Sequence, residues 1–187
     1  MSGSEALAGT YTVATSEEME ALGRRLATQL RGGDLLVLTG PLGAGKTTLT
    51  RGIGEGLDVR GPVTSPTFVL ARTHPSLTGG APLVHVDAYR LGDALELDDL
   101  DIDFASSVVV VEWGSGMLDG VADSWLDVAI ERPTGAADVT SVGDVTGTGD
   151  VTGDGDVTDD GDEGADADAA PEEPRTVTIT QHGPRWM

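Results

Sequence analysis

One glycine-rich motif constrains this chain more than any other feature. Residues 40–47 have the sequence GPLGAGKT and match the pattern G-x-x-x-x-G-K-[ST] in full. The motif follows a short apolar run, Leu35–Thr39, that is typical of a strand buried on both faces. It precedes a predicted helix that continues to about Leu57. A strand, a glycine-rich turn and a helix in this order predict a P-loop, which binds the phosphates of a nucleotide.

The residue types of the motif suit phosphate chemistry. Glycines let backbone N–H groups curl around phosphate oxygens, and the N-terminus of the following helix adds the positive end of its dipole. Lys46 adds a charge for the β and γ phosphates, and Thr47 offers a hydroxyl to Mg²⁺. We expect the nucleotide to be contacted by Gly40, Pro41, Leu42, Gly43, Ala44, Gly45, Lys46, Thr47 and Thr48.

The same lysine narrows the choice of nucleotide. Lys46 is the only lysine in the sequence, and the sequence contains no asparagine. Guanine recognition through an N/T-K-x-D motif needs a further lysine. The protein-kinase signature needs both a β3 lysine and an asparagine in its catalytic loop. We therefore expect ATP with Mg²⁺.

Two acidic residues close apolar runs and are candidates for handling the metal and the attacking water. Asp87 follows residues 83–86, and Glu112 follows residues 108–111. At the carboxyl end of a parallel strand, each side chain would face the ligand crevice. We expect Asp87 to support Mg²⁺, with an ordinary strand-end turn as the alternative, and Glu112 to polarise water or to support the metal. His85 fits a packed histidine as well as a functional one.

The pattern along the rest of the chain predicts an α/β fold. Thr15 and Glu18 form a capping box ahead of an amphipathic stripe that reaches Leu30, and Gly32 and Gly33 are expected to end this helix. The alternation of apolar runs with helical patterns predicts a P-loop NTPase with a mostly parallel sheet flanked by helices. Strands are expected at residues 35–39, 68–71, 83–86 and 108–111, a short acidic helix at 93–100, and an antiparallel C-terminal hairpin at 125–130 and 175–181.

A low-complexity acidic segment, residues 134–174, separates the two hairpin strands. It holds 13 Asp and Glu residues, no Lys or Arg, and five Val as its only large apolar residues. The triplet Asp-Val-Thr recurs every six residues from Asp138 to Asp156. Such a period is also found in calcium-binding repeats, which are the alternative to a disordered segment. The apolar area that this segment can bury is too small to offset the entropy cost of ordering it. We therefore expect a disordered insert. The domain would then comprise residues 1–133 and 175–187.

Composition excludes several functions. The sequence has no cysteine, which excludes disulfides, thiolate zinc sites and cysteine nucleophiles. No apolar run approaches the ~20 residues of a spanning helix, and residues 1–15 lack the pattern of a signal peptide. A formal net charge of −21 opposes autonomous binding to nucleic acid or to an anionic membrane. We expect a soluble, cytoplasmic protein.

Four motifs together resemble the TsaE (YjeE) family, small bacterial P-loop ATPases of tRNA threonylcarbamoyladenosine biosynthesis. They are the glycine-rich motif with Thr48, residues 65–68 (SPTF), residues 85–91 (HVDAYRL) and Glu112-Trp113. The resemblance covers residues 11–130 and 175–186, and the acidic insert departs from it. Residues 64–68 alone would indicate only a turn. The resemblance adds Ser65, Thr67 and Trp113 to the expected nucleotide site.

The resemblance also implies an activity and partners. Members hydrolyse ATP in support of the TsaB and TsaD proteins, which modify the adenosine 3′ of the anticodon in tRNAs that read A-starting codons. Lys46, Thr47 and Asp87 would then hold phosphate and Mg²⁺. Glu112 would be the catalytic carboxylate and a second carboxylate of the metal site, and Lys46 would also take part in catalysis. TsaB-like and TsaD-like proteins are the expected partners, and tRNA would be reached only through them.

Two other classes stay open at this point. A small-molecule kinase would use the same motif, with Asp87 as a base toward an acceptor hydroxyl and Arg90 on the acceptor. Its ATP turnover would depend on a metabolite, whereas a TsaE-like ATPase responds to protein partners and tRNA. A regulatory nucleotide binder would need neither carboxylate and would keep its function without Glu112.

The insert gives a first prediction. Replacing residues 134–174 with Asn-Gly should preserve folding and ATP affinity, because the segment contributes little to a core and loop length affects stability only slowly. Thermal unfolding and ATP binding of both proteins, with and without millimolar Ca²⁺, provide the measurement. Unfolding on deletion, or a Ca²⁺ stabilisation of several degrees in the full-length protein alone, would show an ordered module instead.

Overall fold

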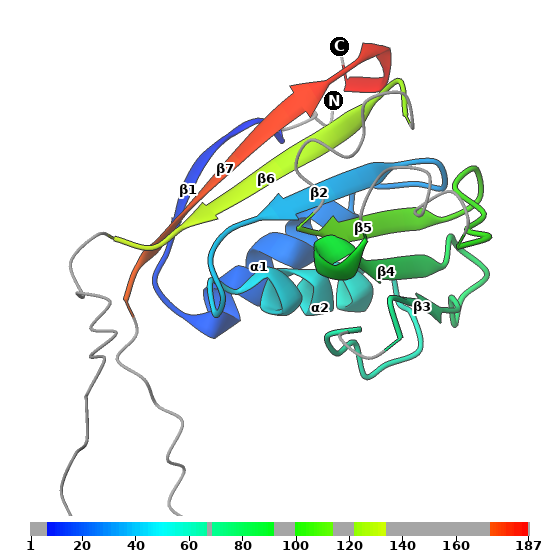
Figure 1. Ribbon diagram of the computed structural model, residues 1–187, viewed down its shortest axis with the longest axis horizontal. Helices are drawn as coiled ribbons and strands as arrows, with labels where there is room; N and C mark the ends of the chain where they lie inside the picture. The colour runs from blue at the N-terminus through cyan, green and yellow to red at the C-terminus, as the bar shows by residue number, and fades with distance from the viewer. Residues whose placement is uncertain (1–6, 67–68, 92–99, 114–121, 134–172, 187) are drawn as a thin grey trace, which may run out of the picture. The chain divides into compact units, whose positions relative to one another are not determined.

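The computed structural model describes residues 7–66, 69–91, 100–113, 122–133 and 173–186. Within these residues seven strands form one sheet in the order β1-β7-β6-β2-β5-β4-β3 (Figure 1). The strands are β1 (Gly9–Val13), β2 (Leu35–Thr39), β3 (Ala71–His74), β4 (Leu83–Asp87), β5 (Val108–Glu112), β6 (Trp125–Glu131) and β7 (Arg175–His182). The helical elements are α1 (Ser16–Ala27), α2 (Lys46–Gly56) and two short 3-10 turns, η1 (Ala88–Arg90) and η2 (Pro184–Trp186).

The middle of the sheet is parallel and both of its sides are antiparallel. β6, β2, β5 and β4 run in the same direction. β7 and β1 pair antiparallel on one side, and β3 pairs antiparallel with β4 on the other. The expected α/β sheet and its C-terminal hairpin, β6 with β7, are therefore confirmed. The structure also has a strand that the sequence pattern did not predict: β1 pairs with β7 and forms this edge of the sheet.

The two faces of the sheet are covered differently. α1 and α2 lie on one face (Figure 1), where Leu36 and Leu38 of β2 join Leu26, Leu49 and Ile53 of the helices in one apolar cluster. The alternate residues of the same strands face the other way. There a second cluster, which includes Leu35, Val37, Val84, Val86, Val109 and Val111, packs against loop residues such as Leu100, Ile102 and Phe104. Burial on both faces explains why these strands are continuous apolar runs.

The N-terminus of α1 is capped largely as predicted. The Glu18 N–H donates to Thr15 Oγ1 at 3.1 Å, and the Glu18 carboxylate accepts from the Ala14 N–H at 2.7 Å, one residue earlier than in a standard capping box. The predicted end of the helix was wrong. α1 ends at Ala27, and four residues separate it from the glycine pair. A Cβ at Gly32 would come within 2.7 Å of the Ser106 carbonyl oxygen, so this glycine serves a close backbone approach instead.

One predicted strand is shifted along the chain, and two predicted segments lie largely outside the described residues. The strand predicted at 68–71 is β3 at Ala71–His74, because Leu70 adopts a left-handed conformation (φ 57°) that delays the start of the strand. Residues 92–99, which hold most of the expected acidic helix, and residues 134–172 of the acidic segment lie outside the described residues. Among the described helices none has the length and apolar character that a membrane crossing requires.

Glycines bring α1 and α2 into backbone contact. A Cβ at Gly52 of α2 would overlap the Glu20 carbonyl group of α1, and a Cβ at Gly23 of α1 would overlap the Leu49 carbonyl oxygen of α2. Side chains at these positions would hold the helices apart. This contact fixes α2, and therefore the residues at its N-terminus, against the sheet.

Gly52→Ala should lower the free energy of unfolding by about 1–3 kcal/mol, because the new methyl group meets backbone that cannot rotate away. Gly80→Ala is the control, since its nearest contact would be Ser76 Oγ at an ordinary 3.5 Å, and it should change stability by less than about 0.5 kcal/mol. Urea unfolding of both variants provides the measurement. Equal stability of Gly52→Ala and the parent protein would contradict the close helix contact.

Candidate nucleotide-binding site

The glycine-rich loop joins the central strand β2 to α2. Gly40 has φ 152°, and a Cβ there would lie 2.5 Å from the Ile130 carbonyl oxygen, so only glycine allows the loop to leave β2 beside β6. Gly43 and Gly45 have φ 72° and 107°, a region that favours glycine. Gly45 is the N-cap of α2 and makes no side-chain capping hydrogen bond. The first N–H groups of a helix lack intrahelical partners, so this end of α2 presents donors to the loop.

Lys46 lies folded back across the loop. Its Nζ donates to the carbonyl oxygens of Gly40 and Pro41 at 2.9 and 3.0 Å, and it lies 3.7 Å from the centre of the Trp113 ring. Burial lowers the pKa of the Lys46 ammonium below its ordinary value, while the nearby carboxylates of Glu112 and Asp87 act in the opposite direction. Among the described residues, this ammonium contacts two carbonyl oxygens and an aromatic ring. No ion pair with a carboxylate within 4 Å is found for it there. It is placed to accept an anionic partner.

The two predicted carboxylates lie side by side. Asp87 ends β4 and Glu112 ends β5, and the two residues are partners in the parallel register. Both are buried. Glu112 Oε1 accepts a hydrogen bond from Thr47 Oγ1 at 3.0 Å, which joins the end of β5 to the start of α2. Asp87 Oδ1 accepts instead from the Tyr89 N–H at 3.1 Å and caps η1.

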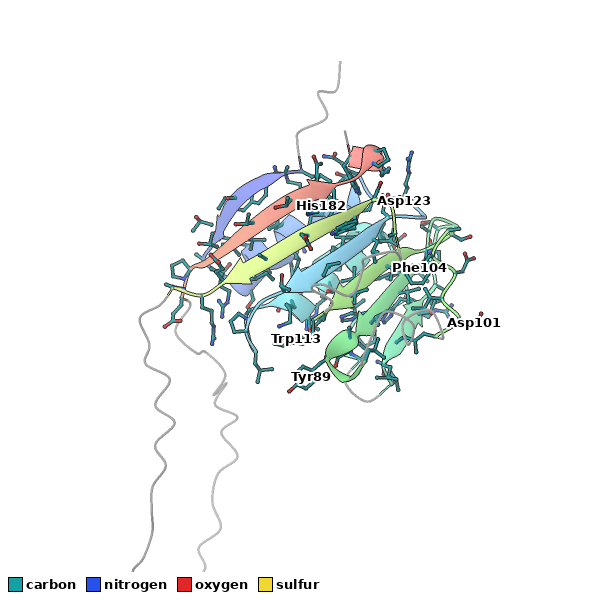
Figure 2. All side chains as sticks on the ribbon, turned by 45° about the horizontal axis from the view of Figure 1, so that its top comes forward. Tyr89, Asp101, Phe104, Trp113, Asp123 and His182 are labelled. Atoms are coloured by element: carbon teal, nitrogen blue, oxygen red, sulfur yellow. The ribbon has the colours of Figure 1, made fainter. Side chains whose placement is uncertain are left out.

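Two aromatic residues form one side of the site. Trp113 has φ 65°, and its N–H donates to the Leu38 carbonyl oxygen at 3.0 Å, so the chain turns sharply as it leaves β5. The Trp113 and Tyr89 rings pack edge to face, with centroids 5.7 Å apart and an interplanar angle of 64°. Figure 2 shows both residues together at the end of β4 and β5. Tyr89 is 75% exposed, which is unusual for an aromatic side chain.

These groups line a cavity of about 670 Å³, within the range of small-molecule sites. Of the residues expected at the nucleotide site, the cavity brings together Leu42, Gly43, Gly45, Lys46, Thr47, Thr48, Ser65, Asp87, Glu112 and Trp113. Gly40, Pro41 and Ala44 belong to the loop but do not line the cavity, and Thr67 lies outside the described residues. The cavity therefore collects most of the predicted residues from four separate parts of the sequence.

The structure adds three residues that the pattern did not assign to the site. Tyr89 lines the cavity, and His85 Nε2 lies 2.7 Å from Glu112 Oε1. Arg175 Nη2, at the start of β7, donates weakly to the Gly43 carbonyl oxygen at 3.4 Å. The order His-x-Asp-x-Tyr was visible around Asp87, but nothing local indicates that Arg175 reaches a loop 132 residues earlier.

The fold and the cavity define an α/β protein with a glycine-rich loop, a buried lysine and paired carboxylates at the carboxyl end of a parallel sheet. Comparison with known proteins gives the family. A family model described as "Threonylcarbamoyl adenosine biosynthesis protein TsaE" matches residues 13–138, and this chain belongs to that family.

Individual relatives agree with the family assignment. A protein from Streptomyces coelicolor is 62% identical over 120 residues, covering 63% of this chain and 81% of its own. A protein from Mycobacterium tuberculosis is 52% identical over 133 residues, covering 66% and 79%. Both are named "tRNA threonylcarbamoyladenosine biosynthesis protein TsaE". The crystal structure of YdiB from Bacillus subtilis is similar with a TM-score of 0.61 and 27% identity, covering 95% of this chain and 88% of that one.

Proposed function

We propose that this protein is an ATPase of the P-loop type that supports the formation of threonylcarbamoyladenosine in tRNA. The observation that carries the proposal is that one cavity brings Lys46 and Thr47, at the start of α2, together with the carboxylates of Asp87 and Glu112. Membership in the TsaE family supplies the biological reaction. The partners would be TsaB-like and TsaD-like proteins, and the activity would be cytoplasmic.

Binding of the triphosphate follows from the loop and the lysine. Phosphate oxygens would accept from the free N–H groups at the N-terminus of α2, where the helix dipole favours negative charge. Lys46 would exchange the carbonyl oxygens of Gly40 and Pro41 for phosphate oxygens, which compensate a buried ammonium more strongly because they are charged. The Trp113 ring over Nζ would move or turn as the phosphate arrives.

The cavity also fits Mg²⁺. This ion prefers oxygen ligands and is held in such sites by one or two carboxylates together with substrate phosphates. Thr47 Oγ1, Asp87 and Glu112 supply this donor set. A bound Mg²⁺ would neutralise charge on the β and γ phosphates. Among the described residues, no three His, Cys, Asp or Glu side chains are grouped so that they could hold a metal ion, and under this proposal phosphate oxygens of the nucleotide would complete the ligand set.

Glu112 would handle the attacking water. Its Oε1 holds Thr47 and lies beside His85, so its other oxygen, Oε2, is the one left to accept a proton from water in the cavity. Asp87 is held by its capping bond to Tyr89 and has one oxygen, Oδ2, left for the metal or its waters. Both carboxylates would therefore support the metal, and Glu112 would in addition activate the water.

The charge of the chain suggests how the RNA enters the reaction. With a net charge of −21, this protein would repel an RNA backbone, so the partner proteins would carry the tRNA contacts. The small-molecule kinase interpretation gains no comparable support, because the relatives are named for tRNA modification.

Lys46→Ala should reduce ATP hydrolysis in the presence of the partner proteins by at least about 100-fold, because it removes the positive charge that meets the transferred phosphate. Arg51→Ala is the control: Arg51 lies on the same helix, but it is exposed and paired with Glu20 at 3.0 Å. We expect Arg51→Ala to keep full turnover. Steady-state phosphate release is the measurement, with thermal unfolding to verify the fold. Unchanged turnover in Lys46→Ala would remove the proposed function.

A further inference from the structure

His85 is a buried polar residue directly behind the site. It lies on β4 and is 0% exposed. It does not line the cavity, so it cannot touch a nucleotide there. Its Nε2 lies 2.7 Å from Oε1 of Glu112, on the neighbouring strand β5. Because residues 85 and 87 share one face of β4 and Asp87 is the register partner of Glu112, the imidazole lies under the carboxylate.

The surroundings of the ring indicate which nitrogen carries the proton. An ionised carboxylate only accepts hydrogen bonds, so Nε2 is the donor in the contact with Glu112. Nδ1 is buried and has no hydrogen-bond partner among the described residues. A proton on Nδ1 would leave a buried donor unpaired, and such groups are costly. The Nε2–H tautomer satisfies the contact with Glu112 and avoids an unpaired donor.

Two donors from different elements hold the same oxygen of Glu112. Thr47 Oγ1 approaches Oε1 from α2, and His85 Nε2 approaches it from β4. A glutamate side chain has several rotatable bonds, and two fixed donors on one oxygen select a single orientation of the carboxylate. If Thr47 Oγ1 took part in holding a bound metal, the hydrogen bond from His85 would still hold Oε1 of Glu112.

We propose that His85 is a positioning residue for Glu112: its Nε2–H holds Oε1 so that Oε2 faces the water to be activated in the cavity. This inference rests on the proposed ATPase function and deepens it. A histidine kept only for packing would fill the same space without needing its N–H group. The two interpretations differ in what a substitution of the same size does to turnover.

Three substitutions separate these roles. His85→Leu keeps the apolar volume and removes the donor. His85→Gln keeps an N–H group close to the position of Nε2. His85→Asn keeps a polar amide that is too short to reach Glu112, and it replaces His85→Leu in the comparison if the leucine variant does not fold. The matched control is His74→Leu, because His74 is also buried in the sheet but contacts the Arg60 carbonyl oxygen at 3.0 Å instead of Glu112.

We expect His85→Leu to lower kcat for ATP hydrolysis, measured with the partner proteins, roughly 10- to 100-fold, as is typical when a partner that orients a functional group is lost. The KM for Mg·ATP should stay within about twofold, since His85 does not touch the nucleotide. His85→Gln should restore kcat to within a few-fold, and His74→Leu should leave it unchanged. An unchanged kcat in His85→Leu, no recovery in His85→Gln, or an equal loss in His74→Leu would overturn the proposal.

Crystal structures of His85→Leu and His85→Gln test the same point without turnover. We expect the Glu112 carboxylate to leave its present orientation in His85→Leu and to keep it in His85→Gln. An identical Glu112 in both variants would overturn the positioning role. If the parent protein hydrolyses no ATP with its partners, the proposed function fails, and the two structures still decide whether His85 holds Glu112.

Discussion

The hydrogen bond from Thr47 Oγ1 to Glu112 Oε1, 3.0 Å long, is the contact on which the arrangement of the site depends. It joins the first turn of α2 to the end of β5. Both sides are fixed by packing: β5 is buried on both faces of the sheet, and α2 is held against α1 through Gly23 and Gly52. A residue in the first turn of α2 and a strand-end carboxylate, 65 positions apart, are thereby brought to hydrogen-bonding distance.

The local electrostatics differ from those of the whole chain. The sequence carries a net charge of −21, which would repel a free triphosphate at long range. Within the cavity, however, the N–H donors at the start of α2 and the Lys46 ammonium make one side positive. Burial lowers the pKa of the Lys46 ammonium. Under the proposed function, Asp87 and Glu112 would need a cation between themselves and the phosphates. Nucleotide and Mg²⁺ are therefore expected to bind together rather than one without the other.

The sequence was sufficient to predict the centre of the fold and most of the cavity. β2 and β5 are continuous apolar runs. Gly40 follows β2, Lys46 begins α2 and Glu112 ends β5, in a recognisable order. The edge strands were harder to place. Most residues of β1 and β3 are not buried, so these strands are not continuous apolar runs, and their pairing is decided by neighbours distant in sequence. The bond between His85 and Glu112 was not predictable for the same reason, since an alternating strand position alone does not show what lies on the adjacent strand.

The most direct test of the account is Glu112→Gln, measured both for equilibrium binding of Mg·ATP and for single-turnover hydrolysis. The amide has the same shape but is not a base. Affinity should therefore stay within a few-fold while hydrolysis falls by about 100-fold or more. That result would identify Glu112 as the group that activates water at a site assembled by Thr47 and the loop. Loss of Mg·ATP binding would instead make Glu112 a binding residue, and unchanged hydrolysis would contradict the account of the site.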